Sequence, residues 1–180
     1  MTAWVIAASV AAGIAAHGVA CAQSIAGAAS SVPPNPIVLV DSTGKIAARA
    51  LNEAMMLITV GRDVAAPAFI RPVYDADGRA ASGLATWQSG GSVLFTSFDC
   101  TTGGYVYSLP QAGGRATAQV QTSAGIVLYV GAIGTTTSVA IHSILYDTGC
   151  ALVTVEQNGL LPVLASVNLS TAYPPPLSFR

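Results

Sequence analysis

The side chains that could do chemistry are few in this chain. Its 180 residues include eight acidic residues, two histidines and three cysteines. Only His142 lies beyond the N-terminal apolar segment, so a Ser-His-Asp triad would have to use it. It stands in the middle of a predicted strand, where a single histidine is more typical of packing than of catalysis. No Cys-x-x-Cys pair is present, and the sequence therefore predicts no metal site.

One tripeptide has the form of a catalytic motif. Asp147-Thr-Gly149 follows the apolar residues 144–146, which resembles the signature of aspartic proteases. In those enzymes two such carboxylates share a proton and activate water, so one chain of this kind would have to dimerise. The sequence has no second Asp-Ser/Thr-Gly, and Cys150 stands where those enzymes have Ser, Thr or Ala. A hairpin turn is the favoured interpretation of Asp147.

Two other groups of residues have weaker patterns. Asp75 and Asp77 begin like a calcium loop, but the turn glycine follows too early and no glutamate stands at the required distance. Tyr105, Tyr107 and Trp87 could form a surface on which a sugar stacks, although such aromatic residues are also typical of core packing or cross-strand pairs. No phosphate-binding loop, dinucleotide fingerprint or Gly-x-Ser-x-Gly elbow occurs, so no cofactor is predicted.

The N-terminal segment predicts export. Residues 1–22 carry no charged side chain, and Ala20-Cys21-Ala22 fits the small-x-small pattern of a signal-peptidase site. We expect a signal peptide at 1–22, a flexible linker at 23–36 and a single β domain at 37–180. Export would place the domain in the periplasm or outside the cell. No Lys or Arg precedes the apolar run, which departs from the usual signal pattern. The run is long enough to span a bilayer, so an uncleaved membrane anchor stays open as an alternative, as does a lipoprotein acylated at Cys21.

Export decides how the other cysteines are interpreted. Once Cys21 leaves with the signal, Cys100 and Cys150 remain. Two cysteines in an oxidising compartment most simply form one disulfide. That bridge would close a loop of about 50 residues and contribute roughly 2–4 kcal/mol. Two free buried thiols are the alternative.

The composition limits the partners of the domain. Hydrophobic residues make up 52% of the chain and charged residues 8%, and the net charge is −1. The charges are scattered singly, so no basic stripe is available for nucleic acid. We expect membrane contact only through the N-terminal segment, if it stays uncleaved. A homo-oligomer and a cell-surface partner stay open, because a near-neutral surface offers little repulsion between copies.

Beyond the linker the sequence predicts an all-β domain. Short apolar or alternating runs, separated by turns that contain glycine pairs such as Gly90-Gly91, predict an antiparallel sandwich or small barrel built from hairpins. Residues 116–122 alternate apolar with polar, which predicts one buried and one solvated face. Only 47–56 has a helical composition. The predicted strands are 35–40, 45–51, 55–60, 69–74, 79–87, 92–98, 105–107, 116–122, 126–130, 138–146, 151–156 and 160–169.

A turn pattern occurs twice. Residues 38–45 and 73–79 each contain an apolar strand end, an Asp, two further residues, a Gly and a basic residue. Asp can accept bonds from backbone N–H groups two residues along, and Gly can adopt a positive φ. The repeat predicts two similar hairpins, with Asp147 in a shortened third.

The C-terminal residues 173–180 combine three prolines with three large apolar side chains. Because Pro174–Pro176 donate no ladder hydrogen bonds, we predict that this tail is not a central strand. It should instead run extended across the domain and bury Leu177 or Phe179. A frayed chain end is the alternative.

Several of these motifs occur together. Residues 98–105 read Phe-Asp-Cys-Thr-Thr-Gly-Gly-Tyr, and they are accompanied by the hairpin at 40–45, the Gly149-Cys150 pair and the tail at 175–179. This combination resembles an uncharacterised family of small exported bacterial β-domains with two cysteines and a Pro-Pro-x-Ser-Phe-like tail. The resemblance covers 37–180. It implies secretion, a β fold and a disulfide, and it implies no activity.

The residues therefore predict an exported structural or binding module that is not an enzyme and whose ligand is unknown. The alternative is a secreted hydrolase, which would be aspartic-protease-like through Asp147. A cluster of titratable side chains in a cleft would favour the hydrolase.

Overall fold

Strands make up nearly all of the regular structure. The computed structural model describes residues 37–109 and 114–180, and within them it has antiparallel sheets and one short helix, α1 (Leu169–Ala172). The predicted all-β class is confirmed. The expected signal peptide at 1–22 and linker at 23–36 lie outside the described residues. No helix in the described ranges is both long and apolar enough to cross a membrane.

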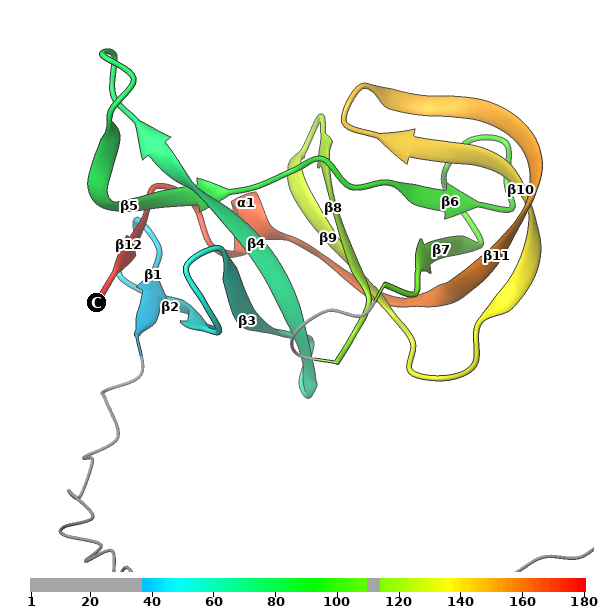
Figure 1. Ribbon diagram of the computed structural model, residues 1–180, viewed down its shortest axis with the longest axis horizontal. Helices are drawn as coiled ribbons and strands as arrows, with labels where there is room; N and C mark the ends of the chain where they lie inside the picture. The colour runs from blue at the N-terminus through cyan, green and yellow to red at the C-terminus, as the bar shows by residue number, and fades with distance from the viewer. Residues whose placement is uncertain (1–36, 110–113) are drawn as a thin grey trace, which may run out of the picture. The chain divides into compact units, whose positions relative to one another are not determined.

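Six strands close into a barrel in the order β1-β12-β5-β4-β3-β2 (Figure 1). Neighbouring strands are antiparallel throughout. The barrel strands are β1 (Val38–Val40), β2 (Ile46–Ala50), β3 (Met55–Val60), β4 (Val64–Tyr74), β5 (Ala80–Trp87) and β12 (Leu177–Phe179).

Residues 47–56, whose composition favours a helix, belong to β2, β3 and the turn between them. Ala47, Ala48 and Met56 are buried in the barrel core. Arg49 pairs with Leu57 across the β2–β3 ladder. The strands predicted at 45–51 and 55–60 are confirmed, because ladder pairing and core burial outweigh the weak helical preference of this composition.

The two Asp-containing hairpins make the same hydrogen bonds, as the sequence repeat predicts. In the β1–β2 turn, Asp41 Oδ1 accepts bonds from the backbone N–H groups of Thr43 (2.9 Å) and Lys45 (3.0 Å). In the β4–β5 turn, Asp75 accepts the equivalent bonds from the residues two and four positions along. The glycine that precedes each basic residue has a positive φ, which a side chain would disfavour.

The C-terminal tail closes the barrel. Leu177–Phe179 pairs with β1 on one edge and with β5 on the other. The prediction that the tail is not a central strand is wrong for these three residues, because Pro174–Pro176 precede the paired segment and need not donate to the ladder. The expected burial is confirmed, since Leu177 is fully buried.

The remaining strands form a second sheet in the order β10-β6-β7-β11-β9-β8. The long β11 pairs with β10, then with β7 and finally with β9. Because β10 also pairs with β6, the strands β10, β6, β7 and β11 form a closed ring, and β6 is buried on both faces. The strands are β6 (Val93–Phe95), β7 (Gly104–Tyr107), β8 (Thr117–Thr122), β9 (Gly125–Gly131), β10 (Thr137–Tyr146) and β11 (Gly149–Asn168).

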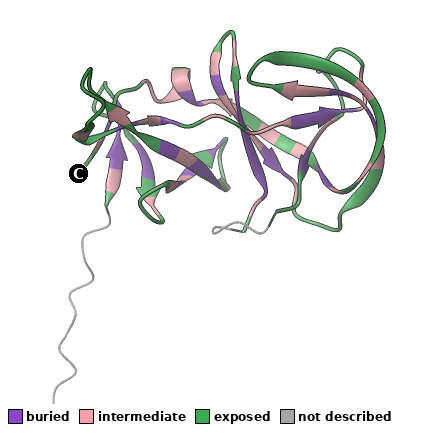
Figure 2. Ribbon diagram, turned by 45° about the horizontal axis from the view of Figure 1, so that its top comes forward, coloured by how far each residue is buried: buried purple, intermediate pink, exposed green. Residues whose placement is uncertain are grey.

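The β8–β9 hairpin joins the two sheets, which belong to one compact unit. Buried segments occur in the strands of both sheets (Figure 2). Leu128 of β9 lies in the barrel core, whereas Ala118 and Val120 of β8 lie in the core of the second sheet. The polar residues that alternate with them, Thr117 and Gln119, are buried too. The expected solvated face is therefore wrong for these two positions, since that face lies against the barrel.

We predict that Asp41 makes the stability of the fold depend on pH. Burial acts to raise the pKa of this carboxyl, but hydrogen bonds from Thr43 and Lys45, together with the Lys45 charge, bring it below its ordinary value. A carboxylate whose pKa falls on folding adds to the free energy of unfolding above its unfolded pKa of about 3.9, and loses that contribution as the pH falls. Urea unfolding of the parent and of Asp41→Asn should give the largest difference at pH 6, narrowing below about pH 4.

Asp75→Asn is the matched control, because it removes the same turn carboxylate at an exposed position. Its effect on the free energy of unfolding at pH 6 should be the smaller of the two. A difference between parent and Asp41→Asn that stays constant or widens in acid would contradict the prediction.

Candidate binding cleft

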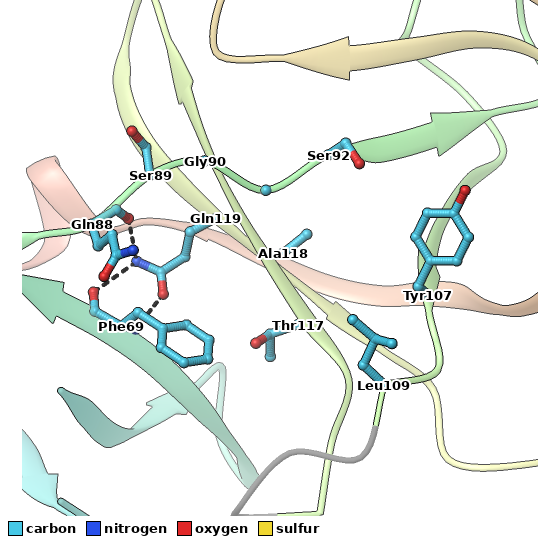
Figure 3. Close-up of a pocket in the computed structure, with 11 residues that line it drawn as sticks. Phe69, Gln88, Ser89, Gly90, Ser92, Tyr107, Leu109, Thr117, Ala118 and Gln119 are labelled. Atoms are coloured by element: carbon cyan, nitrogen blue, oxygen red, sulfur yellow. Dashed lines mark hydrogen bonds between the residues drawn. The ribbon is translucent and has the colours of Figure 1, made fainter.

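A cleft with a volume of about 380 Å³ lies where the barrel meets the second sheet (Figure 3). Residues 117–119 of β8 run through its centre, and the connection 88–92 between β5 and β6 passes along one side. Phe69 of β4 stands at one end, and Tyr107 and Leu109 stand at the other. Pockets of this size are common small-molecule sites.

Gln119 fixes the barrel side of the cleft. β4 pairs with β5 from Ile70 onward, and one further bond follows, in which the Gln88 N–H donates to the Phe69 carbonyl at 3.0 Å. The Phe69 N–H lies beyond this last bond. The Gln119 side chain accepts a hydrogen bond from the Phe69 N–H and donates bonds to the Phe69 carbonyl at 3.0 Å and the Gln88 carbonyl at 2.7 Å. Both amide hydrogens and the amide oxygen are thereby used. The side chain, which is 5% exposed, takes the place of a neighbouring strand.

Thr117 makes a second contact of the same kind. Its hydroxyl donates a hydrogen bond to the Pro67 carbonyl at 3.0 Å. Pro67 has no N–H, so at this position β4 needs a donor for the carbonyl oxygen but needs no acceptor. The polar residues of β8 therefore match the backbone groups that β4 leaves unpaired at this edge.

Gly91 brings the connection 88–92 against β8. Its N–H donates to the Gln119 carbonyl at 2.9 Å. A Cβ atom at this position would lie 2.9 Å from both the backbone N and the backbone O of Gln119, closer than real Cβ atoms approach. The sequence suggests only a glycine pair in a turn, but Gly91 occupies a position that only glycine can fill.

The described residues that line the cleft carry no charge. The side chains of Ser89, Ser92 and Tyr107 make no hydrogen bond to another described residue, so their hydroxyl groups are available to a ligand. Phe69 is half-buried and Tyr107 is 37% exposed, and their rings flank the β8 residues from opposite ends (Figure 3). The cleft can supply hydroxyl hydrogen bonds and apolar contacts.

The aromatic surface that the sequence allowed, as an alternative to core packing, is formed only in part. Tyr107 lies in the cleft, but Trp87 is buried and donates its Nε1–H to the Tyr173 carbonyl at 3.0 Å. Tyr105 packs against the core of the second sheet. The three rings therefore do not share one face, and the core packing that the sequence also allowed holds for Trp87 and Tyr105. Phe69 replaces them, a residue that no local sequence pattern singles out.

Asp147 lies outside the cleft, in the exposed turn between β10 and β11. Its Oδ1 accepts a hydrogen bond of 2.7 Å from the backbone N–H of Gln121, on the edge of β8. The predicted hairpin turn at Asp147 is confirmed, since Tyr146 pairs with Gly149, but the carboxylate does not accept the local hydrogen bonds that Asp41 and Asp75 accept in their turns. The carboxylate instead caps an edge strand.

Cys100 and Cys150 form the disulfide that the sequence predicts, with a Cα–Cα distance of 5.9 Å. It ties the loop after β6 to the start of β11. Buried Ser143 reinforces the tie, because its hydroxyl accepts from the Cys100 N–H at 3.1 Å and donates to the Ser97 carbonyl at 2.6 Å.

His142 stacks on Phe98, with ring centroids 4.5 Å apart, and contributes nothing to the cleft. Asp75 and Asp77 lie in the β4–β5 turn, where the Asp75 carboxylate accepts backbone hydrogen bonds. No group of three or more His, Cys, Asp or Glu side chains in the described part of the chain is arranged to hold a metal ion.

Comparisons of the chain with protein-family models, curated proteins and solved structures give no match. The resemblance to exported bacterial β-domains therefore stays a prediction, and function has to be argued from the cleft.

We predict that Gln119→Leu destabilises the protein through the backbone of β4. The leucine would leave the Phe69 N–H without its partner, which costs about 1–3 kcal/mol when a buried donor is left unsatisfied. Gln121→Leu is the matched control two residues along the same strand, where the side chain is exposed, and should change the free energy of unfolding by about 0.5 kcal/mol or less. Equal effects of the two substitutions in urea unfolding would show that the amide pairing carries no stability.

Proposed function

We propose that this chain is an exported binding module whose cleft takes a neutral, hydroxyl-rich ligand of the carbohydrate class. The observation that carries the proposal is the chemistry of the described lining residues, which combine free hydroxyl groups with two aromatic rings and carry no charge.

The absence of charge among the described lining residues selects against ionic ligands. An ion that leaves water for a partly enclosed site requires an opposite charge or several strong hydrogen bonds. Among the described lining residues, three side chains have free hydroxyl groups, whereas the Gln119 amide is fully hydrogen-bonded to the backbone of Phe69 and Gln88. A neutral ligand with its own donors and acceptors matches these groups.

The rings favour a ligand with an apolar face. A sugar ring has C–H groups on one face and hydroxyl groups at its edge, which suits a site with both aromatic and hydroxyl side chains. Tyr107 combines the two properties, and its position at the mouth of the cleft keeps it accessible.

Binding is favoured over hydrolysis by the same lining. A hydrolase needs a general acid, base or nucleophile next to its ligand. The described lining has no carboxylate and no histidine, and the Asp147 carboxylate accepts a backbone hydrogen bond elsewhere.

Export is supported by the disulfide, because such bonds persist in oxidising compartments. We predict that the secreted protein begins at Gln23 or within a few residues of it, as the Ala20-Cys21-Ala22 pattern indicates. Intact-mass measurement checks this. Full-length protein in the membrane fraction would support the anchor instead, and a mass increase at Cys21 the lipoprotein.

We predict that the protein binds uncharged oligosaccharides through Tyr107. Calorimetric titration of the secreted protein with oligomers of glucose, galactose, mannose and N-acetylglucosamine should find a ligand, and Tyr107→Ala should weaken its binding at least about tenfold. Tyr74→Ala is the matched control, since Tyr74 is an exposed tyrosine outside the cleft. Both variants should keep the melting temperature of the parent.

Three results would contradict the proposal. The first is that none of these oligosaccharides binds. The second is that Tyr107→Ala binds as tightly as Tyr74→Ala. The third is that an anionic oligosaccharide, such as a uronic-acid oligomer, binds more tightly than its neutral counterpart.

A further inference from the structure

The long β10–β11 hairpin has one edge without a partner strand in the described part of the chain. β10 pairs with β11 from Gly149 to Leu160. Leu160 pairs with both Thr137 of β10 and Tyr107 of β7, so β10 and β7 lie on opposite edges of β11. The pairing with β7 covers only Leu160–Pro162. The β7-side edge of residues 149–158 therefore stays open, and in Figure 1 this part of β11 forms the outermost ribbon of the sheet.

This open edge has few features that would keep another strand away. Natural proteins protect edges with lysines, prolines, other charges or bulges. Residues 149–158 contain no Lys or Pro and one charged residue, Glu156. The register with β10 shifts once opposite Ile141–Ser143, which is the only irregularity along this stretch apart from the shift at its end. Most of the stretch is exposed (Figure 2).

Apolar side chains are exposed along the same edge segment. Leu152 is 71% exposed and Val155 is 39% exposed. A strand added to the edge would cover them while it paired the backbone N–H and C=O groups. The burial of apolar surface and the pairing of backbone groups each favour association.

We propose that two copies of this chain associate by antiparallel pairing of residues 149–158 of β11. A second copy presents the same open edge, and an isologous interface brings the same patch of both copies together. Each edge contributes one acidic residue and each chain has a net charge of −1, so the two copies repel each other weakly.

One end of the hairpin is held in place before the chain associates. The Cys100–Cys150 disulfide and the Ser143 hydrogen bonds hold the start of β11 and the neighbouring part of β10 against the loop after β6. Ordering a flexible strand would cost conformational entropy on binding, and a strand that is already fixed avoids most of that cost.

The dimer would carry two clefts, since no residue of 149–158 lines the cleft. Two linked sites on one particle bind a repeating ligand more tightly than one site does. The association is nevertheless independent of the carbohydrate proposal and can be tested without any ligand.

The test measures the mass of the secreted protein by sedimentation equilibrium from about 1 μM to 1 mM. We expect a dimer for the parent, and a dissociation constant raised at least about tenfold by the double variant Leu152→Lys, Val155→Lys. Ile46→Lys is the control, because it places a lysine at an exposed apolar position of a barrel strand. A parent that stays monomeric at 1 mM, or a dimer that the double variant leaves unchanged, would overturn the proposal.

Amide hydrogen exchange separates strand pairing from a loose apolar contact and does not depend on the variants. The amides of 149–158 that face the open edge should exchange at least about tenfold more slowly at 1 mM than at 1 μM, because pairing hides them from water. A dimer without this protection would mean that the copies associate through another surface, which also overturns the proposal.

Discussion

The structure depends on the satisfaction of two backbone groups of β4 at the end of its ladder with β5, the Phe69 N–H and the Pro67 carbonyl, which bond to side chains of β8. A barrel strand with unpaired N–H and C=O groups cannot be covered by apolar side chains without a large desolvation cost. Gln119 and Thr117 remove that cost, because an amide and a hydroxyl can imitate the hydrogen bonds of a strand. The barrel core can therefore extend onto β9, whose Leu128 packs in it. One polar face of β8 makes the joint between the sheets possible.

The second sheet is an insertion between two strands of the barrel. Strands β1 and β12 lie next to each other, and Val38 and Arg180 exchange two backbone hydrogen bonds of 3.0 Å. The barrel is thus completed by the last strand of the chain, and the whole second sheet is inserted between β5 and β12. The cleft lies where the chain leaves the barrel for this insertion, since the connection 88–92 directly follows β5. Such a boundary is a common place for a ligand site, because two packed units rarely fill the space between them completely.

Local signals in the sequence predicted local structure well. The run 55–60 matches β3, and the Asp41 and Asp75 turns follow from a carboxylate that accepts hydrogen bonds within its own loop. The errors concern residues whose environment comes from distant parts of the chain. Gln119 has the polar character of a solvated position, and only its contact with β4, 50 residues away, buries it. Phe69 could not be assigned to a cleft, because its partners there come from three separate segments.

The low charge content connects the cleft and the open edge of β11. With 8% charged residues, the chain has few side chains for either ionic recognition or the protection of strand edges. A neutral cleft can still select a ligand through hydroxyl groups and aromatic rings, so the scarcity of charged side chains does not prevent recognition there. An unprotected edge is different, because its backbone groups pair with whatever strand they meet. Pairing with a second copy of the same edge gives a closed dimer, whereas pairing with unrelated strands leads to aggregation. The disulfide favours the closed arrangement, since it holds the start of β11 in place in each copy.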